Sequence, residues 1–387
     1  MIGQQYLLLP GPTPIPDRVL QAMNRPMINH RGPEFRDMLN GVTGGVKGIY
    51  GTKENLLIYP SSGTGVLEAS VVNFISPGDR VLALSIGVFG DRFATIAQNF
   101  GAEVEKISFK WGETVDPNLV QEIIQKDKDK QIKAVLITHN ETSTGVYNDI
   151  KAVKQAMYDH PALLMVDCVS GLGALEFNMD EWGVDVALSG SQKAFMIPPG
   201  LGFMAFNDRA LETHRNNTNH RYYWDVTAGL NYLEKGQTAF TPAISLIYGL
   251  QEALVMMKEE GLDNIISRHR NYRDMVRQAL RELGLEFLAS DHHASTALTA
   301  VLAPGGSGAN LIRSKMLNRF NIALAGGQLN LDDVMFRIGH LGYVRELDLL
   351  AVIAALEIIM LESGFKVELG AGVNKAQKYI LAMNAKD

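Results

Sequence analysis

Short apolar runs alternate with helical patterns between residues 55 and 206, and this alternation constrains the fold more than any other feature of the chain. Helical patterns follow the first three apolar runs, at about residues 66–74, 91–100 and 150–160. Strands that alternate with helices form a mostly parallel sheet with helices on both faces. The sequence therefore predicts an α/β large domain. The apolar runs that we interpret as strands are NLLIYP, RVLALSIG, KAVLITH, ALLMVDCV, VDVALS and GFMAF.

The pattern changes after Pro242, where a nearly unbroken helical segment extends to Gly284, with Gly261 as the expected joint between two helices. Two further strand-like runs, ALTAVLA and VMFRIG, are separated by a helical pattern at GANLIRSKMLNRF, and the amphipathic VRELDLLAVIAALEIIMLESG follows them. We expect a smaller α+β domain here. The predicted division is an N-terminal arm at 1–17 that packs with the small domain, a large domain at 18–258 and a small domain at 259–387.

Composition excludes several classes of protein. The chain has 387 residues, of which 46% are hydrophobic, so it can bury a large core. A net charge of −6 and a pI of about 5.9 provide no basic surface for nucleic acid. The single cysteine, Cys168, excludes an intrachain disulfide and a multi-cysteine zinc site, and we expect no metal site. No apolar run reaches the roughly 18 residues of a membrane span, and the first residues lack the features of a signal peptide, so we expect a soluble, cytoplasmic protein.

The residues that follow each predicted strand are candidates for ligand binding, because open parallel sheets bind ligands at the carboxyl ends of their strands. After NLLIY, the segment PSSGTG opens a helix, where Ser62, Gly63 and Thr64 could cradle a phosphate with backbone N–H groups. A plain helix cap is the competing interpretation. Phe89 follows the next strand and either stacks on a flat ring or fills the core, and Thr142 follows a third strand.

An acid and a lysine follow two further strands at the same expected edge. Asp167 ends ALLMVD, and a buried carboxylate needs a cationic or N–H partner. Lys193 lies in SGSQK after VDVAL. This lysine is either a solvated loop residue or an amine in a dry cleft, where the charged form is disfavoured and the amine can condense with an aldehyde. A phosphate cradle, an aromatic ring, an acid and a lysine at one edge together indicate a pocket for pyridoxal phosphate.

Motifs spread over nearly the whole chain resemble those of class V aminotransferases of the alanine–glyoxylate and serine–glyoxylate group, and they occur in the same order. The resemblance implies a fold type I pyridoxal-phosphate enzyme. It also implies a homodimer with active sites at the subunit interface. The motifs are LLLPGPTPIP, NHRGPEF, SSGTGVLEA, THNETSTGV, MVDCVSGLGA, LSGSQKA with the PPG that follows it, and FRIGHLG.

The resemblance implies a role for each matching residue. Lys193 would be the Schiff-base lysine and Asp167 the partner of the pyridinium nitrogen. Val169 and Phe89 would pack on the two faces of the ring, and Thr142 would reach the ring oxygen. The residues implied at the phosphate are Ser62, Gly63, Thr64 and Gln192, with Gln237, Thr238 or Thr241 of QTAFTP from the neighbouring subunit.

The resemblance further implies that Arg337 in FRIG binds the substrate carboxylate, for which a planar guanidinium is the matching donor, and that Asn29 in NHRGPEF assists. With a single arginine at the α-carboxylate, we expect ping-pong transamination from alanine or serine to glyoxylate or a similar 2-oxo acid. Aspartate with 2-oxoglutarate is the alternative, and His30 or Arg31 would then be the second cation. Two departures leave the donor open, because Phe89 stands where the family has tryptophan and QTAFTP stands where it has a Tyr-His-His-Thr motif.

Other functions on the same fold remain as alternatives. A pyridoxal-phosphate lyase or decarboxylase would share the cofactor pocket, because the pocket alone does not fix which bond of the substrate breaks. A cysteine desulfurase needs a mobile cysteine, whereas Cys168 directly follows Asp167 on a strand and should point to the opposite face. A non-catalytic subunit is disfavoured because Lys193, Asp167 and Arg337 are all present. A nucleotide-binding module is disfavoured because PSSGTG lacks the acidic residue expected about 20 residues after a glycine fingerprint.

Overall fold

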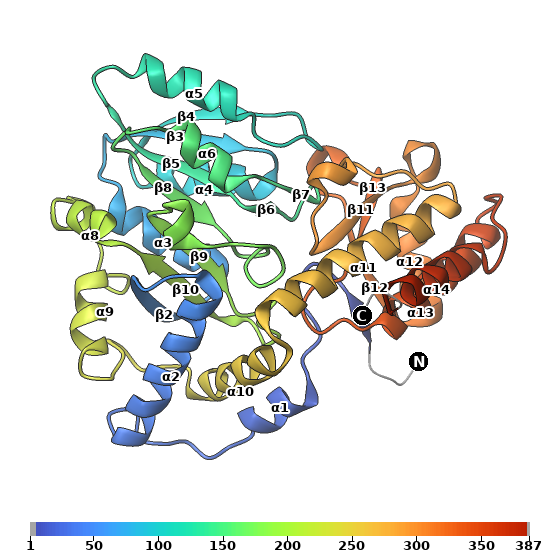
Figure 1. Ribbon diagram of the computed structural model, residues 1–387, viewed down its shortest axis with the longest axis horizontal. Helices are drawn as coiled ribbons and strands as arrows, with labels where there is room; N and C mark the ends of the chain where they lie inside the picture. Colours follow the sequence, from blue (N-terminus) through green and yellow to red (C-terminus); the bar gives the residue numbers. More distant parts are fainter. Residues whose placement is uncertain (1–4, 385–387) are drawn as a thin grey trace.

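The computed structural model describes residues 5–384 and contains two main sheets, each with its own helices (Figure 1). The larger sheet has the strand order β2-β10-β9-β8-β5-β3-β4. All of its strands point the same way except β10, which is antiparallel to both neighbours. The expected mostly parallel α/β sheet is confirmed. Its strands are β2 (Asn55–Ser61), β3 (Arg80–Ser85), β4 (Glu103–Ser108), β5 (Ile132–Thr138), β8 (Leu163–Asp167), β9 (Val186–Gly190) and β10 (Gly200–Phe206).

Helices cover both faces of the large sheet, because buried side chains of its strands alternate between two cores. In β3, Val81 and Ala83 belong to one core, whereas Leu82 and Leu84 belong to the other. The first core is covered by α3 (Gly63–Phe74), α4 (Val88–Asn99), α8 (Asp208–Arg215) and α9 (Val226–Leu233). The second is covered by α2 (Pro33–Tyr50), α5 (Pro117–Lys126), α6 (Ile150–Ala156) and α10 (Ile244–Glu260).

The smaller sheet combines the start of the chain with its last third. Its strand order is β1-β12-β13-β11, and β1 runs parallel to β12, so the N-terminal segment becomes an edge strand. β12 was not expected from the sequence. The strands are β1 (Tyr6–Leu8), β11 (Leu298–Leu302), β12 (Ile322–Gly326) and β13 (Met335–Gly339). The helices around its core are α11 (Leu262–Glu282), α12 (Ala309–Phe320), α13 (Glu346–Glu362) and α14 (Ala371–Asn384).

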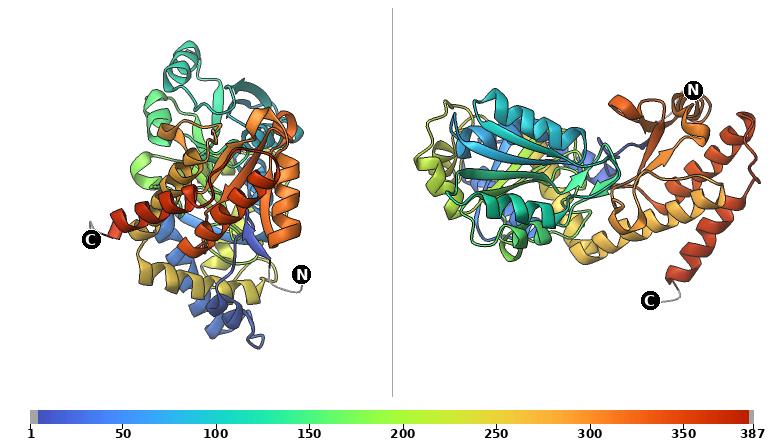
Figure 2. Two further views of the ribbon diagram at one scale, coloured as in Figure 1. Left: turned by 90° about the vertical axis from the view of Figure 1, so that its right-hand side faces the viewer. Right: turned by 90° about the horizontal axis from the view of Figure 1, so that it is seen from above.

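Two consecutive helices connect the sheets, and Figure 2 shows them extending from one lobe to the other. Gly261 separates α10 from α11 with a φ of 85°, a conformation that glycine adopts at little cost, so the predicted joint is confirmed. Near the start of the chain, α1 (Asp17–Met23) packs against α10. We retain the predicted division into 1–17, 18–258 and 259–387 as a proposal.

The helices α3 and α4 begin about three residues earlier than the sequence pattern indicates. Helix α3 begins at Gly63, directly after Ser62, whose hydroxyl accepts a hydrogen bond from the Gly65 N–H at the N-cap. Helix α4 begins at Val88, although its N-cap residue, Gly87, has no side chain. Both shifts bring helix N-termini up to the carboxyl edge of the large sheet.

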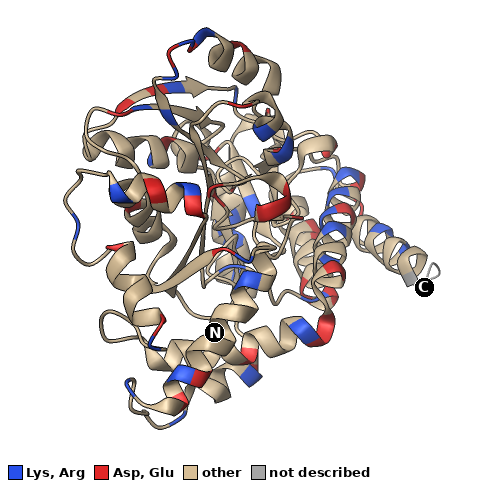
Figure 3. Cartoon of the chain, turned by 60° about the vertical axis from the view of Figure 1, so that its left-hand side comes forward, with Lys and Arg blue, Asp and Glu red and all other residues tan. Residues whose placement is uncertain are grey.

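Charged residues of both signs are interspersed over the helices in Figure 3, which agrees with the modest net charge of −6. Within residues 5–384, the structure has no helix that combines the length and the apolar character needed to cross a membrane.

Candidate active site

A cavity lies at the carboxyl edge of the large sheet, where the N-termini of α3 and α4 meet the loops after β8 and β9. Nine of the residues predicted for the site lie in its wall, although they come from five separate stretches of sequence. Leu67, Arg92, Asn140 and Ser170 complete the wall and were not predicted. The predicted residues that line it are Ser62, Gly63, Thr64, Phe89, Thr142, Asp167, Val169, Gln192 and Lys193.

Lys193 is buried, with 9% of its surface exposed, which excludes the solvated-loop interpretation. Its Nζ donates to the carbonyl oxygen of Pro10 at 2.6 Å. Burial lowers the pKa of the amine to about 8, although the nearby Asp167 acts in the opposite direction. At pH 7 roughly a tenth of such amines are neutral, against less than a thousandth for an ordinary lysine. The residue therefore has the reactivity of a nucleophile or a general base.

The N-terminal segment closes over this lysine. Gly11 has a φ of 131°, and a Cβ built on it would lie 2.5 Å from Lys193 Nζ, so only glycine lets the backbone approach so closely. Thr13 adds two contacts, since its N–H donates to the Gln192 carbonyl and its hydroxyl donates to the Lys193 carbonyl. Residues 10–13 thus help to fix the backbone around the lysine, which explains why LLLPGPTPIP belongs to the same site.

Asp167 ends β8 and is 3% exposed. Within the described residues, its carboxylate accepts one hydrogen bond, from the Val169 N–H at 2.9 Å. Burial raises the pKa of Asp167 to about 7, and the positive charge of Lys193 only partly opposes this. The carboxylate is therefore short of a partner, and a positively charged N–H group in the cavity would restore its ionised form.

The N-terminus of α3 forms an anion-binding cradle. Gly63 packs so closely against Val169 that a Cβ on it would lie 2.7 Å from a Val169 methyl carbon. The carboxamide oxygen of Gln192 is buried beside this helix end and has no hydrogen-bond partner within residues 5–384. Free backbone N–H groups at a helix N-terminus suit a phosphate, and a flip of the Gln192 carboxamide would turn its NH2 group toward the same place as a further donor. The donor set therefore fits a phosphorylated cofactor with a flat, basic ring.

Arg337 on β13 does not line the cavity wall, but it bonds the backbone of Thr142, a wall residue, from the small sheet. Its Nη1 donates to the Thr142 carbonyl at 2.7 Å and its Nε donates to the Gly326 carbonyl at 2.9 Å. The guanidinium is buried, and burial lowers its pKa to about 10 while the negative charge of Glu141 acts in the opposite direction. A guanidinium has five N–H donors, so Arg337 keeps donors for a carboxylate after making these two bonds.

The hydroxyl of Thr142 is engaged within the protein. It donates to Ser170 Oγ at 2.7 Å, and Ser170 Oγ in turn donates to the Asn140 carbonyl at 2.9 Å. Asn140 Nδ2 closes this network by donating to Ser170 Oγ. A donor role for Thr142 toward a cofactor ring oxygen therefore requires its hydroxyl to rotate away from Ser170.

Sequence reasoning missed Glu141, although it lies inside the quoted motif THNETSTGV. The residue is fully buried, and its carboxylate accepts from the N–H groups of Phe89 and Gly90 and from both the N–H and hydroxyl of Ser143. These bonds cap α4, which explains its early start, and they fix Phe89 over the cavity. Burial raises the pKa of Glu141, whereas the four hydrogen bonds oppose that rise. The available signal in the sequence was an acid followed directly by two hydroxyl residues, Thr142 and Ser143.

Arg92 is a second cation at the cavity and was also missed. Its Nη1 donates to Thr64 Oγ1 at 3.1 Å, and its guanidinium carbon lies 4.7 Å from the centre of the Phe89 ring. The expectation that only His30 or Arg31 could supply a second basic residue near the pocket is therefore wrong. Arg92 follows Phe89 by three residues. On a helix this spacing puts both side chains on one face, which could have indicated that Arg92 also lies at the cavity.

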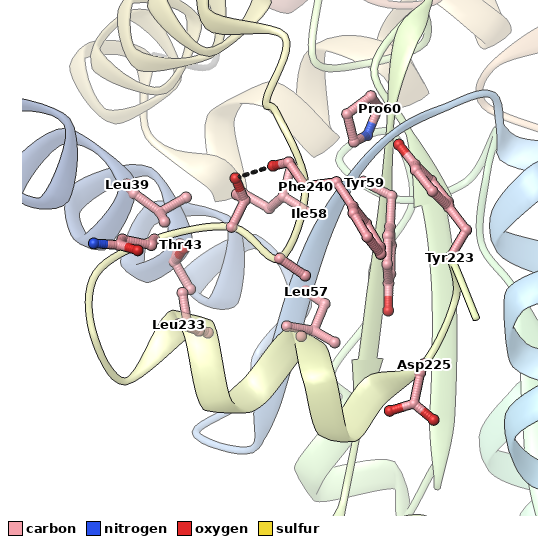
Figure 4. Close-up of a pocket in the computed structure, with 14 residues that line it drawn as sticks. Leu39, Thr43, Leu57, Ile58, Tyr59, Pro60, Tyr223, Asp225, Leu233 and Phe240 are labelled. Carbon is pink, nitrogen blue, oxygen red and sulfur yellow. Dashed lines mark hydrogen bonds between the residues drawn. The ribbon is translucent and has the colours of Figure 1, made fainter. Parts of the chain in front are cut away.

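The remaining predicted residues lie outside the cavity wall of the same subunit. Thr238 lines a separate pocket between α2, β2 and α9, where its hydroxyl donates to the Phe240 carbonyl at 2.6 Å (Figure 4). Arg31 Nη1 donates to the Gln237 side chain and to the Thr238 carbonyl. Asn29 caps the turn before α2 by accepting from the Arg31 N–H, and Thr241 is exposed. These residues form a surface group next to Tyr222, which is 81% exposed and packs on Phe240.

Two further expectations concern sulfur and metals. Cys168 is fully buried in the core on the far side of Asp167, and burial raises the pKa of its thiol, so it lacks the exposure that a desulfurase nucleophile needs. Within residues 5–384, no group of three or more histidine, cysteine, aspartate or glutamate side chains is placed to hold a metal ion.

Comparisons with known proteins agree with this geometry. A family model described as aminotransferase class V matches residues 5–346. The L-aspartate–glyoxylate aminotransferase of Paracoccus denitrificans is 39% identical over 383 residues, which cover 98% of this chain and 97% of that protein. The serine–glyoxylate aminotransferase of Methylorubrum extorquens is also 39% identical, over 387 residues that cover 98% of this chain and 96% of that protein.

A relative that is not named as an aminotransferase has a higher sequence identity. The protein called soluble hydrogenase 42 kDa subunit of Anabaena cylindrica is 44% identical over 380 residues, which cover 98% of this chain and 99% of that protein. Among solved structures, the ureidoglycine–glyoxylate aminotransferase of Bacillus subtilis matches with a TM-score of 0.94 and 29% identity, over 98% of this chain and 99% of that chain.

Proposed function

Because this chain belongs to the class V aminotransferase family and is thus a transaminase, we propose that it uses pyridoxal phosphate to move an amino group from alanine or serine to glyoxylate. The observation that carries the proposal is the enclosure of three groups in one cavity. They are an amine with a pKa lowered to about 8, a carboxylate with a pKa raised to about 7, and a helix N-terminus open to an anion. Fold type I pyridoxal-phosphate enzymes have such a set of groups, which was predicted from the sequence.

The residues present fit the cofactor. Asp167 would pair with the ring nitrogen, because a cation there would relieve the cost of its burial. Phe89 and Val169 would contact the ring, and the N-terminus of α3 with Gln192 would hold the phosphate. When bound, pyridoxal phosphate would supply an electron sink for the charge that develops on the substrate α-carbon.

Lys193 would hold the cofactor covalently at rest and act as the base during turnover. The neutral amine at Nζ would take the proton from the substrate α-carbon and then donate it to the cofactor. The Pro10 carbonyl, which accepts from Nζ at 2.6 Å, would hold the released amine close to this position. Arg337 would bind the substrate α-carboxylate through the N–H groups that Thr142 and Gly326 leave free.

The acceptor proposal rests on the relatives, since the aspartate, serine and ureidoglycine enzymes all have glyoxylate in their names. The donor is less constrained, because one relative is named for aspartate and another for serine. We propose a small monocarboxylic donor because Arg337, bonded to the Thr142 carbonyl, is the cation that approaches the cavity from the small sheet. Aspartate with 2-oxoglutarate is the alternative, and a lyase reaction is a second alternative.

A panel of donors and acceptors tests this function. Alanine, serine, aspartate and glutamate are each incubated with glyoxylate or 2-oxoglutarate, and both keto-acid and amino-acid products are quantified. We expect glycine to form from glyoxylate with serine or alanine as donor, in equal amounts to the keto acid. Preference for aspartate with 2-oxoglutarate contradicts the monocarboxylate proposal, and keto acid without a new amino acid indicates a lyase. Hydrogen-dependent dye reduction, tested on the same protein, would instead favour the activity named for the Anabaena relative.

We also propose a homodimer in which residues 237–241 complete the neighbouring subunit's phosphate site. Support comes from Tyr222 beside the surface group around Thr238, because this aromatic side chain packs on Phe240 and is still 81% exposed. Further support is a groove between α2 and α10, where Gly41, Gly44 and Gly48 leave open space beside Val255, which is 43% exposed. Light scattering should give a mass near 85 kDa, about twice the 42.5 kDa of one chain. A cytoplasmic location remains a proposal and rests on the single cysteine.

A further inference from the structure

Arg92 is a charged side chain of the cavity wall to which neither the family resemblance nor the proposed chemistry gives a role. It is half-buried on α4 and contacts two residues that were predicted to bind the cofactor. Its Nη1 donates to Thr64 Oγ1 at 3.1 Å, and its guanidinium lies 4.7 Å from the centre of the Phe89 ring. Within residues 5–384, Thr64 is the one hydrogen-bond acceptor that Arg92 uses, so most of its five N–H donors remain available.

The hydrogen bond to Thr64 orients the threonine hydroxyl. Because Oγ1 accepts from Arg92, its own hydrogen is free to donate to another group. Thr64 lies in the first turn of α3, the helix whose N-terminus lines the cavity. A phosphate in this cradle would therefore meet the Thr64 hydroxyl as a donor, with the Arg92 guanidinium beside it.

Charge balance gives a second argument. A phosphate ester carries a charge of roughly −1.5 to −2 at pH 7, whereas a helix N-terminus offers only about +0.5. The other residues of the cradle, Ser62, Gly63 and Gln192, are neutral. Lys193 is the second cation in the wall, but its Nζ bonds the Pro10 carbonyl and is assigned to the chemistry. Among the described residues that line the cavity, Arg92 is left to neutralise a phosphate.

We propose that Arg92 binds the cofactor phosphate, both through its own N–H groups and by fixing the Thr64 hydroxyl as a donor. This proposal rests on the proposed function, because it assumes that the cavity holds pyridoxal phosphate. Two other roles for Arg92 predict different results. A guanidinium that only supports the Phe89 ring would affect all ring ligands equally. A guanidinium that binds a distal substrate carboxylate would change the choice of donor but not the binding of cofactor.

The test compares two ligands that differ only in the phosphate. Cofactor-free protein is titrated with pyridoxal phosphate and with pyridoxal, and the absorbance of the bound ligand gives a Kd for each. Arg92→Met removes the charge but keeps an apolar stem of similar length. We expect the Kd for pyridoxal phosphate to rise roughly 10- to 100-fold, the effect of a lost charge-assisted hydrogen bond, while the Kd for pyridoxal stays unchanged. Inorganic phosphate should compete with pyridoxal phosphate in the natural protein and only weakly in the variant.

Two further variants keep the test decisive. Arg92→Lys retains a charge near the phosphate and should recover most of the lost affinity, which an effect of misfolding would not do. Arg80→Ala, at the other end of the large sheet, is the control and should bind both ligands normally. Equal losses for pyridoxal phosphate and pyridoxal, or no loss for either, would overturn the proposal. A natural protein that binds neither ligand would instead overturn the proposed function.

Discussion

At the scale of single residues, the burial of Lys193 sets the pH at which the protein takes up its cofactor. Only the neutral amine attacks the aldehyde, and the pKa of this amine is lowered to about 8. We therefore expect the rate of pyridoxal phosphate binding to cofactor-free protein to rise about tenfold per pH unit below pH 8 and to level off above it. Stopped-flow absorbance measures this rate. A profile that keeps rising to pH 10 would indicate an ordinary, solvated lysine.

The same lysine gives a chemical prediction. Borohydride reduction of the loaded enzyme should attach the cofactor permanently to Lys193, which peptide mass mapping would identify. Lys47 and Lys53 serve as internal controls because neither lines the cavity, and Lys53 is exposed while Lys47 is half-buried. Label on either of them would show that the assignment of Lys193 is wrong.

Arg337 gives a prediction about the substrate. Arg337→Lys keeps a charge but loses the planar fork, so amino-acid binding should weaken by roughly 2 to 3 kcal/mol. The KM for the amino donor should rise accordingly, whereas the absorbance of the bound cofactor should not change. Because Arg337 also bonds the Thr142 carbonyl, a melting curve is needed to separate binding from stability. An unchanged KM would remove Arg337 from the substrate site.

At the scale of elements, the close contact between α3 and the loop after β8 makes the cradle. Gly63→Ala would place a Cβ about 2.7 Å from a Val169 methyl carbon. We expect a loss of about 1 to 3 kcal/mol in unfolding free energy, the usual cost of overpacking, together with weaker cofactor binding. Urea unfolding measures the first effect. The double variant Gly63→Ala, Val169→Ala removes the colliding methyl groups and should recover most of the lost stability; if it does not, the clash is elsewhere.

At the scale of the whole molecule, three buried histidines determine how stability responds to acid. Burial lowers the pKa of His139 to about 4 and those of His269 and His340 to about 3. Each is neutral in the folded protein but is protonated near pH 6.5 when unfolded, so stability is complete above pH 6.5 and is lost as pH falls below it. Asp167 acts in the opposite direction, because its pKa, raised to about 7, lets the folded state bind a proton first.

The pKa shifts of these groups together predict how steeply the unfolding free energy depends on pH. These three histidines and Asp167 alone give a net loss of about 2 kcal/mol in the unfolding free energy between pH 6 and pH 5, for cofactor-free protein. The pKa of His214, also lowered by burial, adds to this loss, whereas the pKa of Glu141, raised by burial, opposes it. His340 donates from Nδ1 to the Thr296 carbonyl and accepts at Nε2 from the Thr299 hydroxyl, and a glutamine amide can replace both bonds. His340→Gln should therefore lower the number of protons taken up on unfolding by about one, and the unfolding free energy should depend less steeply on pH. Equal stability at both pH values would contradict the neutral, buried state of these side chains.

The α/β class, the joint at Gly261 and the gathering of Asp167 with Lys193 could all be predicted from sequence patterns. Asp167 and Lys193 meet because parallel strands bring their carboxyl ends to one edge of the sheet. A residue that follows a strand is therefore expected at that edge, whatever the rest of the fold. Motif order was enough for the family, which the comparisons confirm. The roles of the individual site residues stay predictions.

The other groups that meet at that edge could not be predicted from sequence patterns, because they are brought together by the folded chain. Arg337 bonds the Thr142 carbonyl across 195 positions of sequence, and Glu141 caps a helix that begins about 50 residues before it. Arg92 became a cavity residue because that cap sets where α4 begins, and therefore which of its faces meets Thr64. Burial is the physical reason for the difference: it is set by packing between distant segments, and it determines both which charges interact and how far each pKa moves.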